Sequence, residues 1–252
     1  MTADRDNLRV VLVATRNPLN IGAAARAMSN FGVRGLRVVN PYEAAFREAR
    51  SAVGASGLLA NAEQYENVAE AVADCRLVVG TTVGGARRDL QHRLRRLEDG
   101  ARAIKRQLQT ARVALLFGSE RYGLSNQELS HCHWVMRIPT REEHGSMNLG
   151  QAVAVCLYEL VRGRKAASAA KTARGKKEKT PAKSGEIERL LQQLFQVLDI
   201  SGYVKPRAAA ATEENLRRML QRMQLDAKDT VLWLGILRQI AWKLRANEKD
   251  GE

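Results

Sequence analysis

The segment that decides the fold runs from residue 113 to residue 126 and reads VALLFGSERYGLSN. Its first five residues, 113–117, are all apolar, and glycine and polar residues follow them directly. A short apolar run bounded by turn residues is typical of a fully buried strand in a parallel sheet. We therefore expect residues 113–117 to form a strand, with the polar residues after it in a loop at its carboxyl end.

Similar apolar runs occur on both sides of this segment and alternate with stretches of helical periodicity. The expected strands are residues 10–13, 36–39, 77–79, 113–117 and 134–138, and the expected helices are residues 21–31, 43–54, 97–109 and 148–161. Such alternation is typical of α/β domains with a mainly parallel sheet. The predicted fold class of this part is therefore α/β.

The chain changes character after residue 162. Residues 163–184 are rich in Ala, Lys, Ser and Gly and lack apolar periodicity, which predicts a basic flexible linker. Beyond it, apolar residues recur at helical spacing, at Ile187, Leu190, Leu191, Leu194, Leu198, Leu216, Met219, Leu220, Met223, Val231, Leu234, Leu237 and Ala241. We expect domain 1–162, linker 163–184 and a small all-α C-terminal domain at 185–248.

Composition places the chain among folded proteins. Of its 252 residues, 45% are hydrophobic and 27% are charged, which is close to globular averages. The three cysteines form no C-x-x-C pair, which favours a reducing compartment. No apolar run approaches the roughly 18 residues of a membrane span, and the N-terminus lacks the apolar core of a signal peptide. We expect a soluble, cytoplasmic protein without a membrane partner.

The formal charge of +14 is concentrated in one part of the chain. Residues 162–183 hold nine basic side chains and one acidic side chain. A surplus of this size usually means a polyanionic partner, most often a nucleic acid. An anionic membrane surface is the alternative, but the basic tract lacks the interleaved Trp, Phe or Leu of an interfacial helix.

Polar loops follow four of the predicted strands, and ligands of parallel sheets bind at these carboxyl ends. The loops start at Thr15, Gly80, Gly118 and Pro139 and are rich in Gly, Ser, Thr and Asn. None contains the dinucleotide-binding or P-loop motif. The loops together predict a small-molecule site, although each glycine alone is compatible with a plain turn, and Asn126 or Ser146 with a helix cap.

Arg26 stands among Ala23, Ala24, Ala25 and Ala27, about one turn into a predicted helix. These small neighbours allow another surface to approach closely. The planar guanidinium suits an RNA phosphate or a reacting ribose oxygen. The alternative is an ordinary solvated charge.

Metal and paired-carboxylate chemistry find little support in the sequence. In the run His131-Cys132-His133, consecutive side chains point in different directions, and no further Cys or His stands at ligand spacing. We therefore predict no metal. The pairs Glu142-Glu143 and Glu213-Glu214 are interpreted as solvated charges.

The loops resemble, in order, the three motifs of the SPOUT RNA methyltransferases. Asn20-x-Gly22-x-x-x-Arg26 resembles the first motif, residues 117–126 the second, and residues 138–152 the third. The resemblance covers residues 8–162. Two stretches after the linker, 188–203 and 233–240, are similar to the C-terminal helical domain of one member family, the TrmJ family of tRNA methyltransferases.

The resemblance implies a knotted SPOUT-type parallel-sheet domain, a homodimer, and S-adenosylmethionine-dependent methylation of a ribose 2′-hydroxyl in tRNA, on cytidine or uridine at anticodon-loop position 32. It also implies that the backbone or side chains that hold the cofactor belong to Thr81, Thr82, Val83, Gly118, Ile138, Gly145, Ser146 and Met147. The implied catalytic and substrate-facing residues are Asn20, Arg26, Glu120, Ser146 and Asn148.

For this chemistry we expect Arg26 of one subunit to clamp the phosphate and the developing alkoxide at the other subunit's cofactor. A guanidinium keeps its proton in proteins, so Ser146 or a substrate phosphate is the expected proton relay. Two alternatives remain open. One is a non-catalytic RNA-binding or ribosome-assembly protein, and the other is a related methyltransferase acting on another tRNA position or on rRNA.

Overall fold

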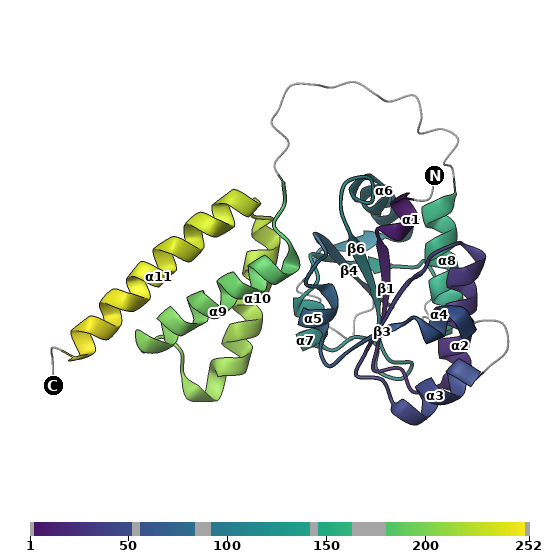
Figure 1. Cartoon of the computed structure of the whole chain (residues 1–252), viewed down its shortest axis with the longest axis horizontal. Helices are drawn as coiled ribbons and strands as arrows, with labels where there is room; N and C mark the ends of the chain where they lie inside the picture. Colours follow the sequence, from purple (N-terminus) through teal and green to yellow (C-terminus); the bar gives the residue numbers. More distant parts are fainter. Residues whose placement is uncertain (1–2, 52–55, 84–91, 142–145, 163–179, 250–252) are drawn as a thin grey trace, which may run out of the picture.

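The structure is a computed structural model that describes residues 3–51, 56–83, 92–141, 146–162 and 180–249. A sheet with helices on both faces forms the sheet region, residues 3–162, and three long helices form the helical region, residues 180–249 (Figure 1). The elements of the sheet region are α1 (Ala3–Asp6), β1 (Leu8–Val13), α2 (Pro18–Asn30), β2 (Gly35–Val39), α3 (Glu43–Ser51), α4 (Ser56–Ala60), β3 (Glu63–Tyr65), α5 (Val68–Val72), β4 (Leu77–Thr82), β5 (Leu94–Arg96), α6 (Leu97–Gln107), β6 (Val113–Phe117), α7 (Asn126–Ser130), β7 (Trp134–Arg137) and α8 (Leu149–Val161). The helical region contains α9 (Ser184–Ile200), the 3-10 turn η3 (Pro206–Ala208), α10 (Ala209–Met223) and α11 (Ala227–Lys249).

The sheet has seven strands in the order β3-β2-β1-β6-β4-β7-β5, and all neighbouring strands are parallel. The predicted α/β class is therefore confirmed. The segment 113–117 is the strand β6, which lies between β1 and β4 and is buried along its whole length. Its unbroken apolar character follows from helices on both faces of the sheet.

One face of the sheet is covered by α2, α6 and α8, which bury Ile21, Met28, Ile104 and Leu157 among others. The other face is covered by the short helices α5 and α7, with Val72 and Leu129 in a second apolar cluster. Helix α2 begins at Pro18, three residues before its predicted start. Arg26 therefore lies about two turns into the helix, not one.

Two strands were not expected from the sequence, β3 and β5, and they form the two edges of the sheet. Each has only three residues, and neither is apolar throughout. Their pairing partners, β2 and β7, determine that they are strands. Short charged edge strands are also the ones that resist unwanted pairing with other chains.

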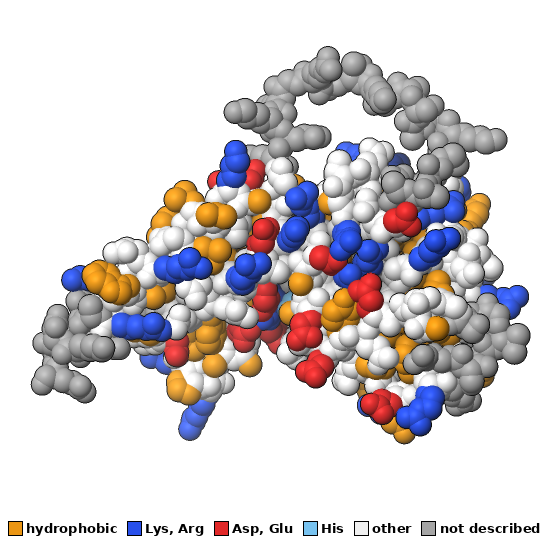
Figure 2. All heavy atoms as spheres, in the orientation of Figure 1, with side chains coloured by type: hydrophobic (Ala, Val, Ile, Leu, Met, Phe, Trp, Pro, Cys, Tyr) orange, Lys and Arg blue, Asp and Glu red, His pale blue; other side chains and the backbone are white. Residues whose placement is uncertain are grey.

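In the helical region, α9 packs between α10 and α11 around Leu190, Leu191, Leu220 and Leu237. The prediction that Val231 belongs to this packing face is wrong, because its side chain is 70% exposed. The buried face of α11 runs through the predicted Leu234, Leu237 and Ala241 and continues to Leu244. Hydrophobic side chains consequently remain on the surface of the helical region (Figure 2).

The helical region packs on α5 and α7. The backbone N–H and the hydroxyl of Ser184 both donate to the carbonyl of Cys75, at 2.8 and 3.0 Å. The N–H of Gly185 donates to the carbonyl of Ala73 at 2.9 Å. These bonds secure the start of α9 against the sheet region. Residues 163–179 of the predicted linker lie outside the described residues.

Arg217 of α10 also stabilises the contact between the helical region and the sheet region. Its side chain is buried, donates to Ser130 of α7 at 3.3 Å, and forms ion pairs with Glu188 at 3.0 Å and Glu213 at 2.5 Å. The expectation that Glu213 and Glu214 are merely solvated is wrong, because Glu214 also pairs with an arginine of α10, at 3.4 Å. A buried arginine here requires its carboxylates, since an unpaired buried charge is costly.

Across the described part of the chain, every helix is too short or too polar to span a membrane.

The predicted knot depends on the continuous path of the backbone. That path includes residues 84–91 and 142–145, and both segments lie outside the described residues. The knot therefore stays a prediction.

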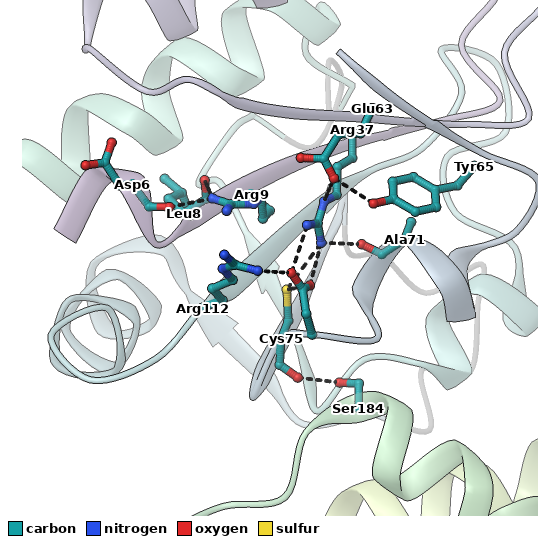
Figure 3. A network of polar contacts seen from close by, with 11 residues as sticks. Asp6, Leu8, Arg9, Arg37, Glu63, Tyr65, Ala71, Cys75, Arg112 and Ser184 are labelled. Carbon is teal, nitrogen blue, oxygen red and sulfur yellow. Dashed lines mark hydrogen bonds and ion pairs between the residues drawn. The ribbon is translucent and has the colours of Figure 1, made fainter. Parts of the chain in front are cut away.

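An ionic network around the buried Arg37 of β2 joins this strand to β3 and to the segments that follow α5 and precede β6 (Figure 3). The guanidinium of Arg37, 4% exposed, donates to both carboxylate oxygens of Asp74 at 2.6 and 2.9 Å and to Glu63 at 3.0 Å. Arg112 donates to Asp74 from the other side at 2.5 Å. Burial opposes ionisation of Asp74, but the hydrogen bonds and charge of Arg37 outweigh it and hold the pKa of this carboxyl well below its usual range.

The variant Asp74→Asn should lower the free energy of unfolding by about 3 kcal/mol at pH 7, because it leaves the buried charge of Arg37 without its bidentate partner. Asp74 has a depressed pKa in the fold, so its contribution is complete above the ordinary carboxyl pKa of about 4 and is lost as the pH falls below it. Urea titrations at pH 7 and pH 3 test this: the deficit should shrink at pH 3.

The matched control is Asp99→Asn, which removes an exposed pair with Arg102. It should change the stability by less than about 0.5 kcal/mol at both pH values. Equal effects of the two substitutions at pH 7 would contradict the stabilising role of the network.

Candidate active site

The carboxyl ends of four adjacent strands bring the motif loops together. In the sheet order, β1, β6, β4 and β7 are consecutive neighbours, so the loops that follow them share one edge. The loop after β1 leads into α2, the loop after β6 leads into α7, and the segment after β7 leads into α8. The three motifs, far apart in sequence, therefore meet at one place.

The carboxylate of Glu120 joins the first two motifs. It accepts hydrogen bonds from the backbone N–H groups of Arg16 at 3.4 Å and Asn17 at 3.3 Å. It also accepts from Nδ2 of Asn20 at 3.1 Å. One side chain after β6 thus holds the loop after β1 and the first turn of α2.

Asn148 joins the third motif to this network. Its Nδ2 donates to Oδ1 of Asn20 at 2.7 Å. Its Oδ1 accepts from the backbone N–H groups of Gly150 and Gln151, so Asn148 is the N-cap of α8. We call the three side chains Glu120, Asn20 and Asn148 the polar triad. The structure brings together these three predicted site residues.

The N-cap residues of α7 and α8 are not the two residues that the sequence suggested as helix caps. Asn126 and Ser146 do not cap helices: the cap of α7 is Ser125, in a capping box with Glu128, and the cap of α8 is Asn148. Asn148 therefore caps α8 in addition to being part of the triad.

Gly118 is required by its own loop. A Cβ at this position would lie 2.1 Å from the carbonyl carbon of Gly123 and 2.3 Å from the nitrogen of Leu124. The chain turns tightly there, with the N–H of Gly123 donating to the carbonyl of Ser119 and Gly123 at φ +67°. A branched residue at 118 would disrupt this turn, so such a variant would change the loop as well as any ligand contact.

Arg26 is not part of the polar triad. It lies six residues beyond Asn20 on α2, which is about 9 Å along the axis and 120° around it. Its side chain is exposed and forms no ion pair with the described residues. On the same flank of the helix, Ala23 packs so closely on α8 that a Cβ on Gly150 would lie 2.5 Å from the Cβ of Ala23. Arg26 thus stands at the outer surface of the α2–α8 pair.

The predicted cofactor residues follow three neighbouring strands. Thr81 and Thr82 end β4, Val83 follows them, Gly118 follows β6, and Ile138 follows β7. The hydroxyl of Thr81 donates to the carbonyl of Leu116 at 2.9 Å, which ties β4 to β6 at this edge. Val83 is 46% exposed, and Ile138 is half-buried. Ser146 is exposed, Met147 is half-buried, and Gly145 lies outside the described residues.

His131 and His133 lie just before β7, at the amino end of the strands and away from the site, and have structural roles. Nδ1 of His133 accepts from the N–H of Val78 at 3.1 Å, and burial lowers the pKa of His133 to about 4. Burial and the charge of Arg217 lower the pKa of His131 to about 3. Both imidazoles are therefore neutral at pH 7. No cluster of three or more potential metal ligands occurs within the described ranges.

Sequence reasoning missed the contribution of the backbone at the end of β1. Ala14 adopts a left-handed φ of +51°, which is unusual for a residue with a side chain. The hydroxyl of Thr15 next to it is buried and has no hydrogen-bond partner among the described residues. These features prepare the turn that presents Arg16 and Asn17 to Glu120. No residue type in this stretch indicates them, because alanine has no preference for that conformation.

The chain is similar in sequence to known RNA methyltransferases. Residues 7–158 match the model of the SpoU rRNA Methylase family. A tRNA (cytidine/uridine-2′-O-)-methyltransferase TrmJ from Sodalis glossinidius (strain morsitans) is 36% identical over 93% of this chain and 91% of its own length. The TrmJ from Cronobacter sakazakii is 35% identical over 93% of this chain and 96% of its own length.

A solved structure extends the likeness to the helical region. The crystal structure of TrmJ from Z. mobilis ZM4 superposes with a TM-score of 0.78 at 31% identity, over 92% of this chain and 98% of that one. The match therefore includes the α9–α11 helices as well as the sheet. The chain belongs to the SpoU methylase family of SPOUT RNA methyltransferases and, within it, to the TrmJ group.

Proposed function

We propose that this protein transfers the methyl group of S-adenosylmethionine to the ribose 2′-hydroxyl of a cytidine or uridine in tRNA, at position 32 of the anticodon loop, in the cytoplasm. The observation that carries the proposal is the polar triad, which unites the three motif loops at the carboxyl edge of the sheet. The printed activity of the TrmJ relatives supports the choice of tRNA and of the 2′-oxygen.

The residues at the ends of β4, β6 and β7 fit an adenosyl cofactor. Val83 and Ile138 offer partly exposed apolar side chains to a flat base, and the ends of adjacent strands present backbone amides and carbonyls at close spacing. The proposed binding residues are Thr81, Thr82, Val83, Gly118, Ile138, Gly145, Ser146 and Met147. When bound, S-adenosylmethionine supplies an activated methyl group on a sulfonium sulfur.

The chain's own residues supply position and charge. Glu120 and Asn148 fix the amide of Asn20, and with it the first turn of α2, beside the strand ends that hold the cofactor. Arg26 holds a substrate phosphate and stabilises negative charge as the 2′-oxygen loses its proton. The hydroxyl of Ser146, which is exposed, or a substrate phosphate relays that proton to solvent. Most of the acceleration comes from positioning.

We propose that the active form is a homodimer built on the α2–α8 surface. That surface exposes Leu19 to 79% and Tyr158 to 54%, apolar area that a partner would cover. Arg26 lies on the same surface and about 120° away from Asn20 around α2. In the dimer, Arg26 of one subunit therefore serves the cofactor site of the other.

Arg26→Ala should lower the single-turnover methylation rate by a factor of about 10² to 10⁴, because charge stabilisation at the 2′-oxygen is lost. S-adenosylmethionine affinity and sedimentation should stay within error of the wild type, since the residue touches substrate only. Arg26→Lys should be almost as slow, because a lysine cannot form the bidentate contact. Near-normal rates for Arg26→Ala would refute its role.

Glu120→Gln should lower the methylation rate about tenfold to a hundredfold, because one carboxylate oxygen becomes an NH₂ group facing the N–H donors of Asn17 and Asn20. The cofactor dissociation constant should change less than about twofold. The control Glu98→Gln replaces an exposed glutamate on α6 and should have no effect. A Glu120→Gln enzyme as fast as this control would show that the triad has no part in positioning.

The role of the basic tract in tRNA binding is tested by the salt dependence of the affinity. Replacing the seven basic residues within 163–179 by glutamine should weaken tRNA binding and flatten the slope of log K against log salt by several units, at about 0.7 to 0.9 per lost phosphate contact. S-adenosylmethionine binding, measured by calorimetry, should be unchanged. An unchanged slope would mean that the tract is only a tether.

A further inference from the structure

The helical region contains a surface cavity of about 380 Å³ that the catalytic site does not use. It is lined by Tyr203, Thr212, Asn215, Leu216, Arg218, Met219 and Arg222. Its volume lies in the range of ligand pockets, about 300 to 1,000 Å³. Except for Tyr203, which follows α9, all of these residues belong to one face of α10, at helical spacings of three and four.

The arginines of α10 differ in how much of their charge is already paired. Arg217 is buried and its charge is neutralised by Glu188 and Glu213. Arg218 lines the cavity and is held by Glu214 and by the amide oxygen of Asn215, at 3.4 and 2.7 Å. Arg222, one turn further, is exposed and has no ion pair among the described residues. Its charge is available to a ligand of the cavity.

The remaining lining groups suit a nucleotide. Tyr203 is 66% exposed at the cavity, and a flat, accessible ring of this kind stacks on bases. Because the oxygen of Asn215 accepts from Arg218, its Nδ2 is left to donate to a base edge. Leu216 and Met219 add apolar walls.

We propose that this cavity binds one unpaired nucleotide of the RNA substrate, with its base on Tyr203 and its phosphate on Arg222. The inference rests on the proposed function for the RNA substrate and adds a second contact point remote from the methylated ribose. A single base outside a helix is the form in which proteins commonly read RNA.

The surroundings of the cavity favour RNA over a free small anion. Burial lowers the pKa of His92, and the charges of Arg218 and Arg222 lower it further, so the cations of α10 lie close to the start of β5. Arg93 and Arg96 are exposed there. Lys and Arg side chains occur on both regions of the molecule in Figure 2. The cavity therefore adjoins further positive charge, as a polyanion requires.

The test uses the full-length protein and a pool of unmodified tRNA transcripts, with dissociation constants measured by filter binding at four salt concentrations. Arg222→Ala should weaken binding about fivefold and reduce the salt slope by about one, because one phosphate contact is lost. Tyr203→Ala should weaken binding about tenfold without changing the slope, because stacking carries no charge. Tyr203→Phe should restore wild-type affinity.

The matched control is Arg238→Ala, an exposed arginine on α11 that does not line the cavity. Circular dichroism should confirm that all variants fold. Affinities and slopes for Arg222→Ala and Tyr203→Ala that equal those of Arg238→Ala would overturn the cavity proposal, whatever the methylation rate. The proposed function fails separately, if the wild-type protein binds tRNA but incorporates no methyl group from labelled S-adenosylmethionine.

Discussion

The arrangement of the candidate site depends on the carboxylate of Glu120. Because Asn20 donates its Nδ2 to Glu120, its Oδ1 must accept, and Asn148 donates to it. The Oδ1 of Asn148 is then committed to the first N–H groups of α8. Each amide orientation follows from the one before, so reversing either amide breaks bonds at both ends. One ionised group thereby orients the polar side chains of three loops.

The hydrogen bonds of the polar triad also affect how α2 and α8 pack. The bond between Asn20 and Asn148 sets the first turns of α2 and α8 side by side, and the close approach of Ala23 to Gly150 follows one turn later. Small residues in this part of the chain thus allow close contact between the two helices. The outer flank of the pair then carries Arg26, at a position that the polar triad of its own chain does not use.

The sequence predicts the buried parts of this fold well, because β6 and its neighbours are apolar on both faces. It does not predict β3 and β5, whose pairing depends on partners distant in sequence. Within the site, the resemblance to the family's motifs points to Glu120, Asn20 and Asn148, but not to the fact that they bond to one another. Gly118 has the same ambiguity: a glycine needed by its own turn and a glycine needed by a ligand look alike in a sequence.

The arginines of α10 show most clearly what a sequence leaves open. Arg217 and Arg218 are adjacent and both pair with carboxylates, yet Arg217 contacts the sheet region and Arg218 lines a cavity, because consecutive side chains of a helix point 100° apart. Arg217 bonds to Ser130 of α7, and α7 follows directly on the loop that carries Glu120. The anchoring of α10 therefore fixes the cavity relative to the loop that carries Glu120, through the five residues of α7. A substrate held both at the cavity and at the loop of Glu120 would be positioned through this connection. The buried ion pairs of Arg217 would then be needed for the exposed charge of Arg222 to act on the substrate.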